Sequence, residues 1–433
     1  MRSINIGLIG AGTIGIGVID SVIKNGGLIA ERTGVLPVIR SVCDTNASVL
    51  KNIIGIDNLI KTTSADAIIG DKEIDIVVEL IGGVYPAKEI VLAALTNRKH
   101  VVTANKALLS EHWKEIFTVA SKNSVFVGFE ASVGGGIPVI RVIRESFVSN
   151  NLEIIYGILN GTTNFVLTMM AKHDHSFDKA LSIAQKKGFA ESDPRMDISG
   201  RDSAHKLTIL SLLGFGVSVI PDDIYTEGIE AITPQDIRYA EEWGYSIKLL
   251  AIAKNTRKGL QLRVHPTLIP SRHLLAGVNG ENNAVYIKGD FVGESLFYGK
   301  GAGADPTASS VMSDIVEIAK HVVCCGKEHS VPGELPHDFV TSDIVNIKEL
   351  ILPYYLRFSV IDKPGVLSGI SSVLSENDIS IASMSQEERK VGETVPVIML
   401  THKACEGNMR KAIEAIDKMD FVMDKTMVIR VEM

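Results

Sequence analysis

A glycine-rich turn at the start of the chain constrains the fold more than any other feature. Residues 4–9 (INIGLI) have the apolar character of a buried parallel strand, and residues 10–15 (GAGTIG) follow directly before a helical stretch toward Ile23. Strand, GxGxxG turn and helix in this order favour a dinucleotide-binding Rossmann unit, in which the helix N-terminus faces the pyrophosphate. The alternative is a glycine turn that only packs the helix against the strand.

The second predicted strand ends in a carboxylate that can select the cofactor. Residues 38–44 (VIRSVCD) are typical of a strand, and Asp44 at its end is the candidate partner for the ribose 2′-hydroxyl. Asp44 lies farther along the chain than the usual ~20 residues, so the connection must be enlarged. Arg40 and Lys51 are near enough to keep NADP open, and Asp44 could instead start an Asp-Thr-Asn turn. The pattern slightly favours NAD over NADP.

Two further strands are predicted at residues 74–80 and 100–103, with a helix over 86–97 between them. Open parallel sheets bind ligands beyond the carboxyl ends of their strands. The loop after the second of these strands contains Lys106, where a nicotinamide or its substrate would lie. A lysine after a strand is more often simply solvated.

Two loops farther on carry polar or flexible groups. Residues 130–138 (EASVGGGIP) contain glycines that leave backbone carbonyls free to turn toward an ion, and they can equally form a hinge between domains. Residues 152–160 alternate as a strand, and the following Gly-Thr-Thr-Asn segment, 161–164, supplies hydroxyl and amide groups. These groups can bind a ligand or simply cap the next helix.

A dense charged stretch over residues 185–206 precedes an apolar helical run that begins near Arg201, with Gly214 as its predicted C-cap. Asp202 and Lys206 are i and i+4 on this helix. A solvated pair would contribute only about 0.2–0.5 kcal/mol and would carry no functional information. A buried pair would favour a functional role, because ion pairs rarely outperform apolar packing for stability. The neighbouring acceptors are Glu191, Asp193 and Asp197.

Composition and charge exclude several classes of partner. The chain has 433 residues, 45% of them apolar and 22% charged, which is typical of a globular chain with two or three domains. The net charge of −7 argues against nucleic acid or an anionic membrane and leaves a small-molecule substrate as the expected partner. We find no export signal and no apolar run of about 18 residues, the length that a membrane span needs. The four cysteines have no metal-ligand spacing, so we expect a reducing cytoplasm without disulfides or zinc: Cys43, Cys324, Cys325 and Cys405.

The C-terminal part is predicted to be a separate module. Strands are expected at 355–360, 379–384, 395–401 and 428–431, with a helix after residue 364 and another over 409–419. The order βαββαβ is that of a ferredoxin-like unit.

Taken together, these motifs resemble the homoserine dehydrogenase family in order and spacing from residue 1 to about 325, and the tail resembles an ACT domain over its whole length. The segments that carry the resemblance are 10–15, 102–109, 130–138, 159–165, 188–194 through Lys206, and 298–308, with DKPGVL at 362–367 in the tail. The fold class implied is α/β, with an N-terminal Rossmann-type doubly wound sheet, a central α+β catalytic and dimerisation domain, and a C-terminal ferredoxin-like domain.

The resemblance implies the reversible NAD(P)H-dependent reduction of L-aspartate 4-semialdehyde to L-homoserine, in threonine, methionine and isoleucine biosynthesis. Lys206 matches the proton donor, Lys106 matches a lysine that touches both cofactor and substrate, and Asp202 supports the catalytic centre. The implied substrate-binding residues are Glu191, Asp197, Asp202 and Thr162. The implied cofactor-binding residues are Gly10, Gly12, Thr13, Ile14, Gly15, Asp44, Lys106, Gly188 and Gly303. A structural sodium ion is implied at Glu130, Val133, Gly135 and Ile137, through oxygen ligands.

Two positions depart from the family pattern. Phe189 stands where a tyrosine is usual, and Asp305 is an unusual acid beside Gly303 that would disfavour a 2′-phosphate if it lies close. Oxidation of an aldehyde to an acyl phosphate would need a cysteine nucleophile, and no cysteine falls within these motifs. The remaining alternative is an amino-acid sensor that has lost catalytic turnover.

The predicted domains are a dinucleotide-binding domain over 1–130 with a returning segment near 300–325, a catalytic and dimerisation domain over 131–300, a linker over 326–352 and an ACT domain over 353–433. ACT modules commonly pair and bind amino acids, so we expect a homodimer or homotetramer with threonine as the candidate effector. A purely structural, dimerising tail is the alternative.

Overall fold

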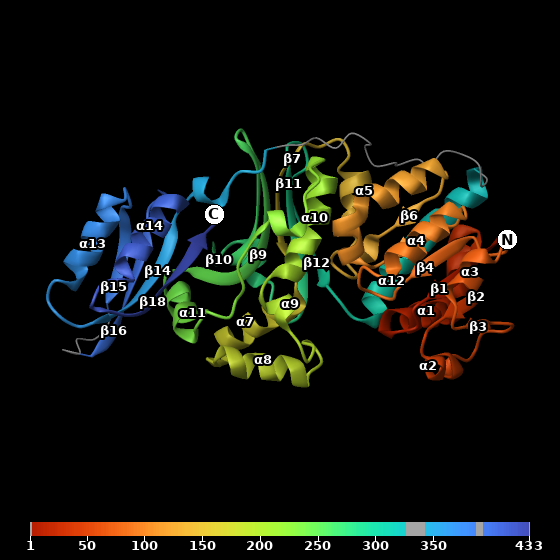
Figure 1. The fold of residues 1–433 in the computed structure, drawn as a ribbon, viewed down its shortest axis with the longest axis horizontal. Helices are drawn as coiled ribbons and strands as arrows, with labels where there is room; N and C mark the ends of the chain where they lie inside the picture. The colour runs from red at the N-terminus through yellow and green to blue at the C-terminus, as the bar shows by residue number, and fades with distance from the viewer. Residues whose placement is uncertain (1, 326–342, 387–392, 433) are drawn as a thin grey trace. The chain divides into compact units, whose positions relative to one another are not determined.

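The computed structural model describes residues 2–325, 343–386 and 393–432. The chain divides into two compact units (Figure 1). The first comprises Met1–Leu152, His205–Asp223 and Asn283–Thr341, and the second comprises Glu153–Ala204, Ile224–Asn282 and Ser342–Met433. Most of the predicted linker, residues 326–342, lies outside the described residues.

The first unit contains a six-stranded sheet in the order β3-β2-β1-β4-β5-β6, and every neighbouring pair is parallel. This is the strand order of a Rossmann fold, so the predicted N-terminal fold is confirmed. The strands are β1 (Arg2–Ile9), β2 (Val35–Cys43), β3 (Ile60–Thr62), β4 (Ile76–Glu79), β5 (His100–Thr103) and β6 (Val127–Gly128). The sequence pattern predicted β5 with its observed bounds, whereas β3 and β6 are too short to give a pattern of their own.

Helices complete the first unit. They are α1 (Thr13–Thr33), α2 (Ala47–Asn52), α3 (Ala65–Gly70), α4 (Ala87–Thr96), α5 (Lys106–Lys122), the short α6 (Val139–Arg141) and α12 (Ala304–Cys325). Short helical turns are η1 (Glu130–Ser132), η2 (Val142–Ser146) and η3 (Pro221–Asp223), and the hairpin strands are β11 (Asn282–Gly289) and β12 (Gly293–Lys300). α12 comes from far along the chain and packs against α1.

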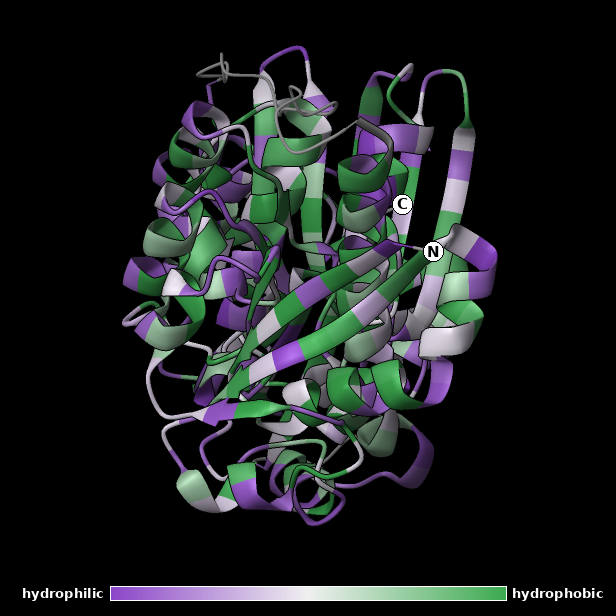
Figure 2. Cartoon of the chain, turned by 90° about the vertical axis from the view of Figure 1, so that its right-hand side faces the viewer, coloured by the Kyte–Doolittle hydropathy of each residue, from purple (hydrophilic) through white to green (hydrophobic). Residues whose placement is uncertain are grey.

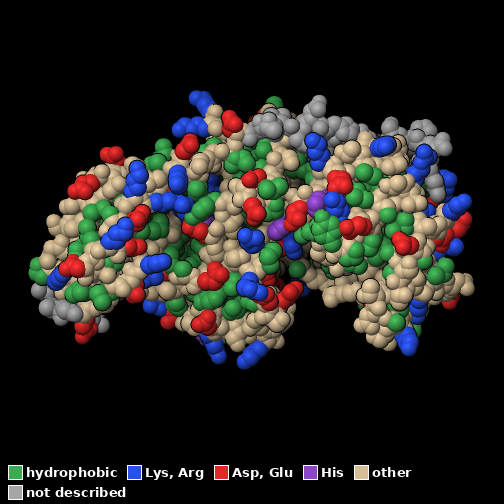
Figure 3. Space-filling view, viewed as in Figure 1, with side chains coloured by type: hydrophobic (Ala, Val, Ile, Leu, Met, Phe, Trp, Pro, Cys, Tyr) green, Lys and Arg blue, Asp and Glu red, His purple; other side chains and the backbone are tan. Residues whose placement is uncertain are grey.

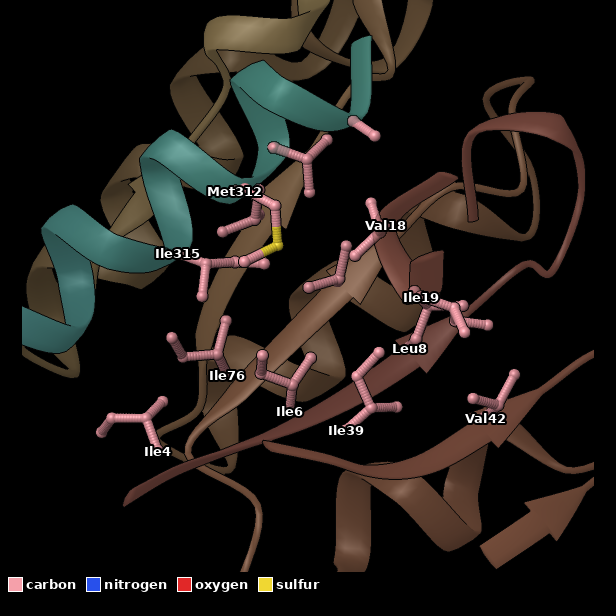
Figure 4. Packing of buried hydrophobic residues seen from close by; sticks show 14 of the residues in the cluster. Ile4, Ile6, Leu8, Val18, Ile19, Ile39, Val42, Ile76, Met312 and Ile315 are labelled. Atoms are coloured by element: carbon pink, nitrogen blue, oxygen red, sulfur yellow. The ribbon is translucent and has the colours of Figure 1, made fainter. Parts of the chain in front are cut away.

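The core of this unit lies between the sheet and the pair α1 and α12. Figure 4 shows Met312 and Ile315 of α12 directed toward side chains of β1 and β2, among them Ile6 and Ile39. These residues are at most 5% exposed. Burial on both faces explains why the central strands are mostly apolar rather than strictly alternating, and Figure 2 shows the polar bands that interrupt both the strands and the helices.

α1 is long and apolar enough to cross a membrane by length and composition alone. Its composition has another explanation in the structure, because Val18 and Ile19 are buried in the Rossmann core. The core helix of a globular domain and a membrane span share this composition.

On the face drawn in Figure 3, acidic and basic side chains are interspersed.

The second unit is built on a mixed sheet. Its strands run in the order β7-β9-β10-β18-β14-β16-β15, with β8 pairing with β10. The central elements are β7 (Leu152–Ile158), α7 (Gly161–His173), α8 (Phe177–Lys186), α9 (Arg195–Ile198), β8 (Tyr225–Thr226), α11 (Pro234–Glu242), β9 (Tyr245–Thr256), β10 (Gly259–Pro270) and η4 (Leu274–Gly277). α10 (Arg201–Phe215) begins in the second unit and continues in the first.

The C-terminal module is the predicted ferredoxin-like unit. It consists of β14 (Tyr354–Ile361), α13 (Val366–Glu376), β15 (Ile381–Gln386), β16 (Thr394–Thr401), α14 (Glu406–Ile416) and β18 (Val422–Val431), preceded by η5 (Ile347–Glu349) and β13 (Ile351–Leu352), which pairs with β17 (Ala404–Cys405). Its own core includes Phe358, Ile370 and Ile416. β18 pairs antiparallel with β14 and parallel with β10, so the module's sheet continues into the central sheet (Figure 1).

Two details differ from the sequence predictions. The sequence pattern does not predict the hairpins β9–β10 and β11–β12. β9, β10 and β11 are buried along most of their length and lose the period-2 alternation that identifies a strand, whereas β12 is only partly buried. Gly214 is not the C-cap of α10. The helix continues to Phe215, and Gly216, with φ of 68°, has the left-handed conformation that ends it.

Candidate active site

The three glycines of the N-terminal turn each meet a different steric requirement. Gly10 has φ of 100°, and a Cβ there would lie 2.7 Å from the Leu80 carbonyl. A Cβ on Gly15 would lie 2.1 Å from the Gly10 carbonyl oxygen, whereas one on Gly12 would meet no protein atom within 4 Å. Gly10 and Gly15 are therefore required by the fold, and Gly12 faces the open space that a pyrophosphate would fill.

The end of this turn also suits an anion electrostatically. α1 begins at Thr13 and has no acidic residue in its first turn. A helix of this length directs N–H groups and a partial positive charge toward a ligand at its N-terminus. The residues present therefore fit a dinucleotide.

Asp44 accepts two backbone hydrogen bonds, one from the glycine turn and one from the turn that it begins. Its Oδ2 accepts a hydrogen bond of 2.9 Å from the backbone N–H of Ala11, inside the glycine turn. Its Oδ1 accepts one of 2.8 Å from Asn46, which forms the predicted turn. Each carboxylate oxygen keeps a second lone pair, so the residue remains a candidate for a ribose hydroxyl.

The carboxyl edge of the sheet holds a polar network that sequence reasoning missed. Glu79 at the end of β4 is fully buried, and it accepts hydrogen bonds from the Thr103 hydroxyl at 2.6 Å and from the Ile81 N–H at 2.9 Å. Burial raises the pKa of Glu79, while these donors lower it. The Asn105 amide donates to the Gly83 carbonyl at 2.5 Å. The network orders the loop beside the glycine turn.

Lys106 lies at this same edge. It is the first residue of α5, directly after β5, and Asn105 caps the helix by accepting from the Leu108 N–H. The ends of β1, β4 and β5 are in register, with Ile9 opposite Glu79 and Glu79 opposite Thr103. The first unit therefore brings Lys106 to the sheet edge that carries the glycine turn.

α10 carries the second candidate lysine. Lys206 is 8% exposed and Asp202 is 4% exposed, so the solvated surface pair is excluded. In the first unit, the Ser110 hydroxyl of α5 lies 2.7 Å from Nδ1 of His205. Ser110 is one turn from Lys106 and His205 adjoins Lys206, so the helices carrying the two lysines meet through this hydrogen bond.

Asp197 and Asp202 are brought together in the second unit by one amide. Asn160 Nδ2 donates to Asp197 Oδ1 at 2.8 Å and to Asp202 Oδ2 at 2.9 Å. Its Oδ1 caps α7 by accepting from the Thr163 N–H at 2.8 Å. The Thr162 hydroxyl lies 2.9 Å from Asp197 Oδ2 and 2.6 Å from the Phe189 carbonyl. The sequence pattern places Asn160 at the end of the predicted strand 152–160, and it predicts neither the cap nor the link to both carboxylates.

The rest of the charged stretch is more exposed. Glu191 is exposed, and Asp193 pairs at the surface with Arg195, which lowers the pKa of the Asp193 carboxyl to about 2. Gly188 has φ of 75° in the turn after α8, and Phe189 packs against Phe165 with ring centroids 4.9 Å apart. Asp193 is therefore already paired with a cation, and the role of Glu191 stays a prediction.

The candidate sodium loop contains hard oxygen donors. Both carboxylate oxygens of Glu130 accept backbone N–H groups, from Ile140 and Arg141. The Gly135 carbonyl accepts from the Ser310 hydroxyl, and the Ile137 carbonyl accepts from Val139. Oxygen donors of this kind fit a hard cation, although several already accept a hydrogen bond and would have to use their second lone pair.

A buried carboxyl pair lies beside this loop. Asp314 accepts from the Glu130 N–H at 2.8 Å, and burial together with the Glu130 charge raises the pKa of Asp314 to about 8. Burial also raises the pKa of Glu130, which Arg141 partly offsets. Among the described residues, no cluster of three or more His, Cys, Asp or Glu side chains could hold a metal.

Gly303 precedes α12, with φ of 118°. A Cβ on Gly17 of α1 would lie 2.9 Å from the Ala304 carbonyl, so the start of α12 lies one turn from Thr13. Gly303 is thus on the glycine-turn side of the first unit. Asp305, in the first turn of α12, is exposed and favourably placed in the helix dipole.

A glycine fingerprint on a parallel sheet of this strand order is typical of dinucleotide-binding proteins, the class that includes the nicotinamide-dependent oxidoreductases. The sequence profile described as "Homoserine dehydrogenase, NAD binding domain" matches residues 10–130, and that described as "Homoserine dehydrogenase" matches residues 138–316. An ACT domain profile matches residues 354–421. The chain belongs to the homoserine dehydrogenase family.

Relatives agree over the full length. The homoserine dehydrogenase of Neisseria gonorrhoeae is 42% identical, covering 100% of this chain and 99% of the relative, and that of Pseudomonas aeruginosa is also 42% identical, with the same coverage. The crystal structure of a homoserine dehydrogenase from Thiobacillus denitrificans is similar with a TM-score of 0.92 and 43% identity, covering 99% of this chain and 98% of that one. A hyperthermophilic archaeal homoserine dehydrogenase in complex with NADPH aligns with a TM-score of 0.60 and 26% identity, over 73% of this chain and 97% of that one.

Proposed function

We propose that the protein catalyses the reversible reduction of L-aspartate 4-semialdehyde by NAD(P)H and a proton to L-homoserine and NAD(P)⁺. The observation that carries the proposal is the burial of Asp202 and Lys206 on one helix, in a chain whose full length is 42% identical to named homoserine dehydrogenases. Burial of charged side chains costs stability rather than adding to it, so a catalytic reason is the better explanation for these two residues.

Lys206 is assigned to the reacting oxygen. When bound, the cofactor supplies or accepts the hydride. Reduction leaves negative charge on the former carbonyl oxygen, and a preorganised ammonium in a closed site stabilises that charge and donates the proton. In the oxidative direction Lys206 takes the hydroxyl proton. Lys106 is the second candidate for this transfer, because α5 and α10 meet through Ser110 and His205.

The carboxylates are assigned to the substrate's ammonium group. Asp197 and Asp202 are tied through Asn160, which leaves lone pairs on each carboxylate for the substrate. Glu191 and the Thr162 hydroxyl complete the proposed set. Held at fixed positions, these groups limit the orientations of the bound substrate, and such orientation can supply several kcal/mol of the barrier reduction.

Cofactor binding is assigned to the glycine turn from Gly10 to Gly15 with Asp44, Lys106, Gly188 and Gly303. The Asp44 carboxylate at the end of β2 favours a free ribose 2′-hydroxyl and therefore NAD, and NADP is the alternative cofactor to test. Sodium is proposed at Glu130 and the carbonyls of residues 133, 135 and 137, where it would offset the buried carboxyls. Its role is structural.

Regulation is assigned to the C-terminal module over residues 353–433. An amino-acid end product, threonine first among them, is proposed to bind there in a homodimer or homotetramer that works in the cytoplasm. The catalytic domain is proposed over 131–300 and the dinucleotide-binding domain over 1–130, with 300–325 returning to it and 326–352 linking to the ACT domain.

The test is steady-state turnover of L-homoserine and of aspartate semialdehyde with NAD and NADP cofactors in parallel, with and without threonine and sodium. We expect turnover with both substrates and preference for one cofactor. Absence of turnover with every pair, in protein that still binds an amino acid, would replace the enzyme by the sensor alternative.

A further inference from the structure

A buried arginine joins the C-terminal module to the central domain. Arg430 of β18 is 3% exposed and donates to Glu406 of α14 through Nε at 2.9 Å and through a terminal nitrogen at 2.6 Å. Its other terminal nitrogen, Nη1, donates to Glu227 at 2.6 Å, and the nitrogen that binds Glu406, Nη2, also donates to the Tyr225 hydroxyl at 3.1 Å. One guanidinium thus binds a helix of the module and the segment that follows β8.

The segment after β8 packs directly on the turn between α9 and α10. The Ile229 N–H donates to the Ile198 carbonyl at 3.0 Å. A Cβ on Gly228 would lie 2.5 Å from that same carbonyl, and a Cβ on Gly200 would lie 3.2 Å from the Glu227 carbonyl. The two backbones are therefore in contact without room for any larger residue.

This turn connects the residues that carry the two candidate substrate carboxylates, Asp197 and Asp202. Asp197 lies in α9 directly before Ile198, and Asp202 lies in the first turn of α10, two residues after Gly200. The Gly200 N–H donates to the Asp197 carbonyl at 3.0 Å. A shift of residues 225–229 would pass to residues 198–200 through backbone contacts, and from there to both carboxylates.

We propose that Arg430 is a positioning residue for substrate binding, which holds residues 225–229 against the turn that carries Asp197 and Asp202. The inference rests on the proposed function, because it takes these carboxylates as the ligands of the substrate's ammonium group. Without the guanidinium, Glu406 and Glu227 lose their shared partner, and the segment that carries Glu227 keeps only the contact of Tyr225 with Arg410 among its described contacts with the module.

Another ion pair of the same junction provides a control. Arg357 of β14 donates to buried Asp236 of α11 at 2.6 Å and is 12% exposed on its side chain. It also ties the module to the central domain, but through α11 rather than through residues 225–229. Arg357→Met therefore reproduces the loss of a buried arginine at this junction without breaking the link to the turn.

The experiment compares Arg430→Met, Arg430→Lys, Glu227→Gln and Arg357→Met in the full-length enzyme. We expect Arg430→Met to raise the KM for L-homoserine about tenfold, less than the ~100-fold that a 1 Å misplacement of a reacting group can cost, with the KM for the cofactor within about twofold of wild type. Arg430→Lys should recover part of the loss. Glu227→Gln removes the charge of the more exposed partner of the Arg430–Glu227 ion pair, and it tests the inference if Arg430→Met does not fold. Arg357→Met should leave both KM values near wild type.

Hydrogen–deuterium exchange of residues 196–203 is the readout that does not depend on turnover. We expect faster exchange in Arg430→Met and Glu227→Gln, and wild-type exchange in Arg357→Met. Equal changes in both KM values, an equal homoserine effect in Arg357→Met, or unchanged exchange in Arg430→Met would overturn the inference. A wild-type protein that does not turn over homoserine would refute the proposed function instead, and the exchange data would still decide whether Arg430 positions the turn.

Discussion

Replacing Asn160 separates its role as a helix cap from its role between the two carboxylates. Its side chain caps α7 through Oδ1 and donates to Asp197 and Asp202 through Nδ2. Loss of an N-cap costs about 1 kcal/mol of unfolding free energy. A hydrogen bond to a charged group contributes about 1.5–3 kcal/mol, so losing the orienting donor should lower kcat/KM for homoserine by roughly 10- to 100-fold.

Two variants and a control make the prediction specific. Asn160→Ala removes both functions, whereas Asn160→Asp keeps a good cap and places an acceptor beside the two carboxylates. Ser176→Ala is the control: the Ser176 hydroxyl caps α8 by accepting from the Lys179 N–H, and it makes no hydrogen bond to Asp197 or Asp202 among those described. The assays are chemical unfolding and homoserine oxidation with saturating cofactor. If Asn160→Asp keeps wild-type kcat/KM, or if Asn160→Ala loses only the stability that Ser176→Ala loses, then Asp197 and Asp202 are not positioned by Asn160.

Further predictions concern the glycine turn and a buried lysine. Gly12→Ala should fold with near wild-type stability and raise the cofactor KM, because its Cβ would meet no protein atom and would occupy space proposed for the cofactor. Gly15→Ala should destabilise the fold, since its Cβ would lie 2.1 Å from a carbonyl oxygen. Thermal unfolding and cofactor titration distinguish the two variants, and equal destabilisation would contradict the assignment. Burial, followed by the charge of Lys172, lowers the pKa of Lys248 to about 8. Between pH 8 and 10.5 the unfolded chain therefore binds more protons than the folded protein does. The free energy of unfolding should rise by about 3 kcal/mol over that range relative to Lys248→Met, which lacks this ionisation. Parallel pH dependences of the two proteins would show that Lys248 does not titrate in this way.

Sequence patterns over a few residues predicted those elements whose formation depends on neighbouring residues along the chain. The glycine turn, β5 and the order of the C-terminal module follow from steric needs of glycine and from apolar periodicity over a few residues. Asp202 and Lys206 were recognisable as an i, i+4 pair, although burial decides their meaning and depends on the whole fold. Gly216 shows that a helix end is harder to predict than its existence, since several residues near an end can adopt the capping conformation.

Features that depend on long-range contacts could not be predicted. Asn160 is 37 residues from Asp197, and Arg430 is 203 residues from Glu227, so neither contact leaves a pattern in a window of sequence. Glu79 gave no signal either, because a carboxylate at a strand end is ordinarily solvated, and only the closed sheet edge buries it. The residues that orient the candidate site were therefore harder to find than the residues expected to act in it.

The most direct test of the central claim is the turnover number of Lys206→Ala for homoserine oxidation, measured with cofactor binding as the check on folding. The assignment of Lys206 to the reacting oxygen predicts a fall of about 100- to 10,000-fold in kcat with an almost unchanged dissociation constant for the cofactor. A variant that binds cofactor normally and retains a kcat within a few-fold of wild type would contradict that assignment and move the proton transfer to Lys106 or to another group.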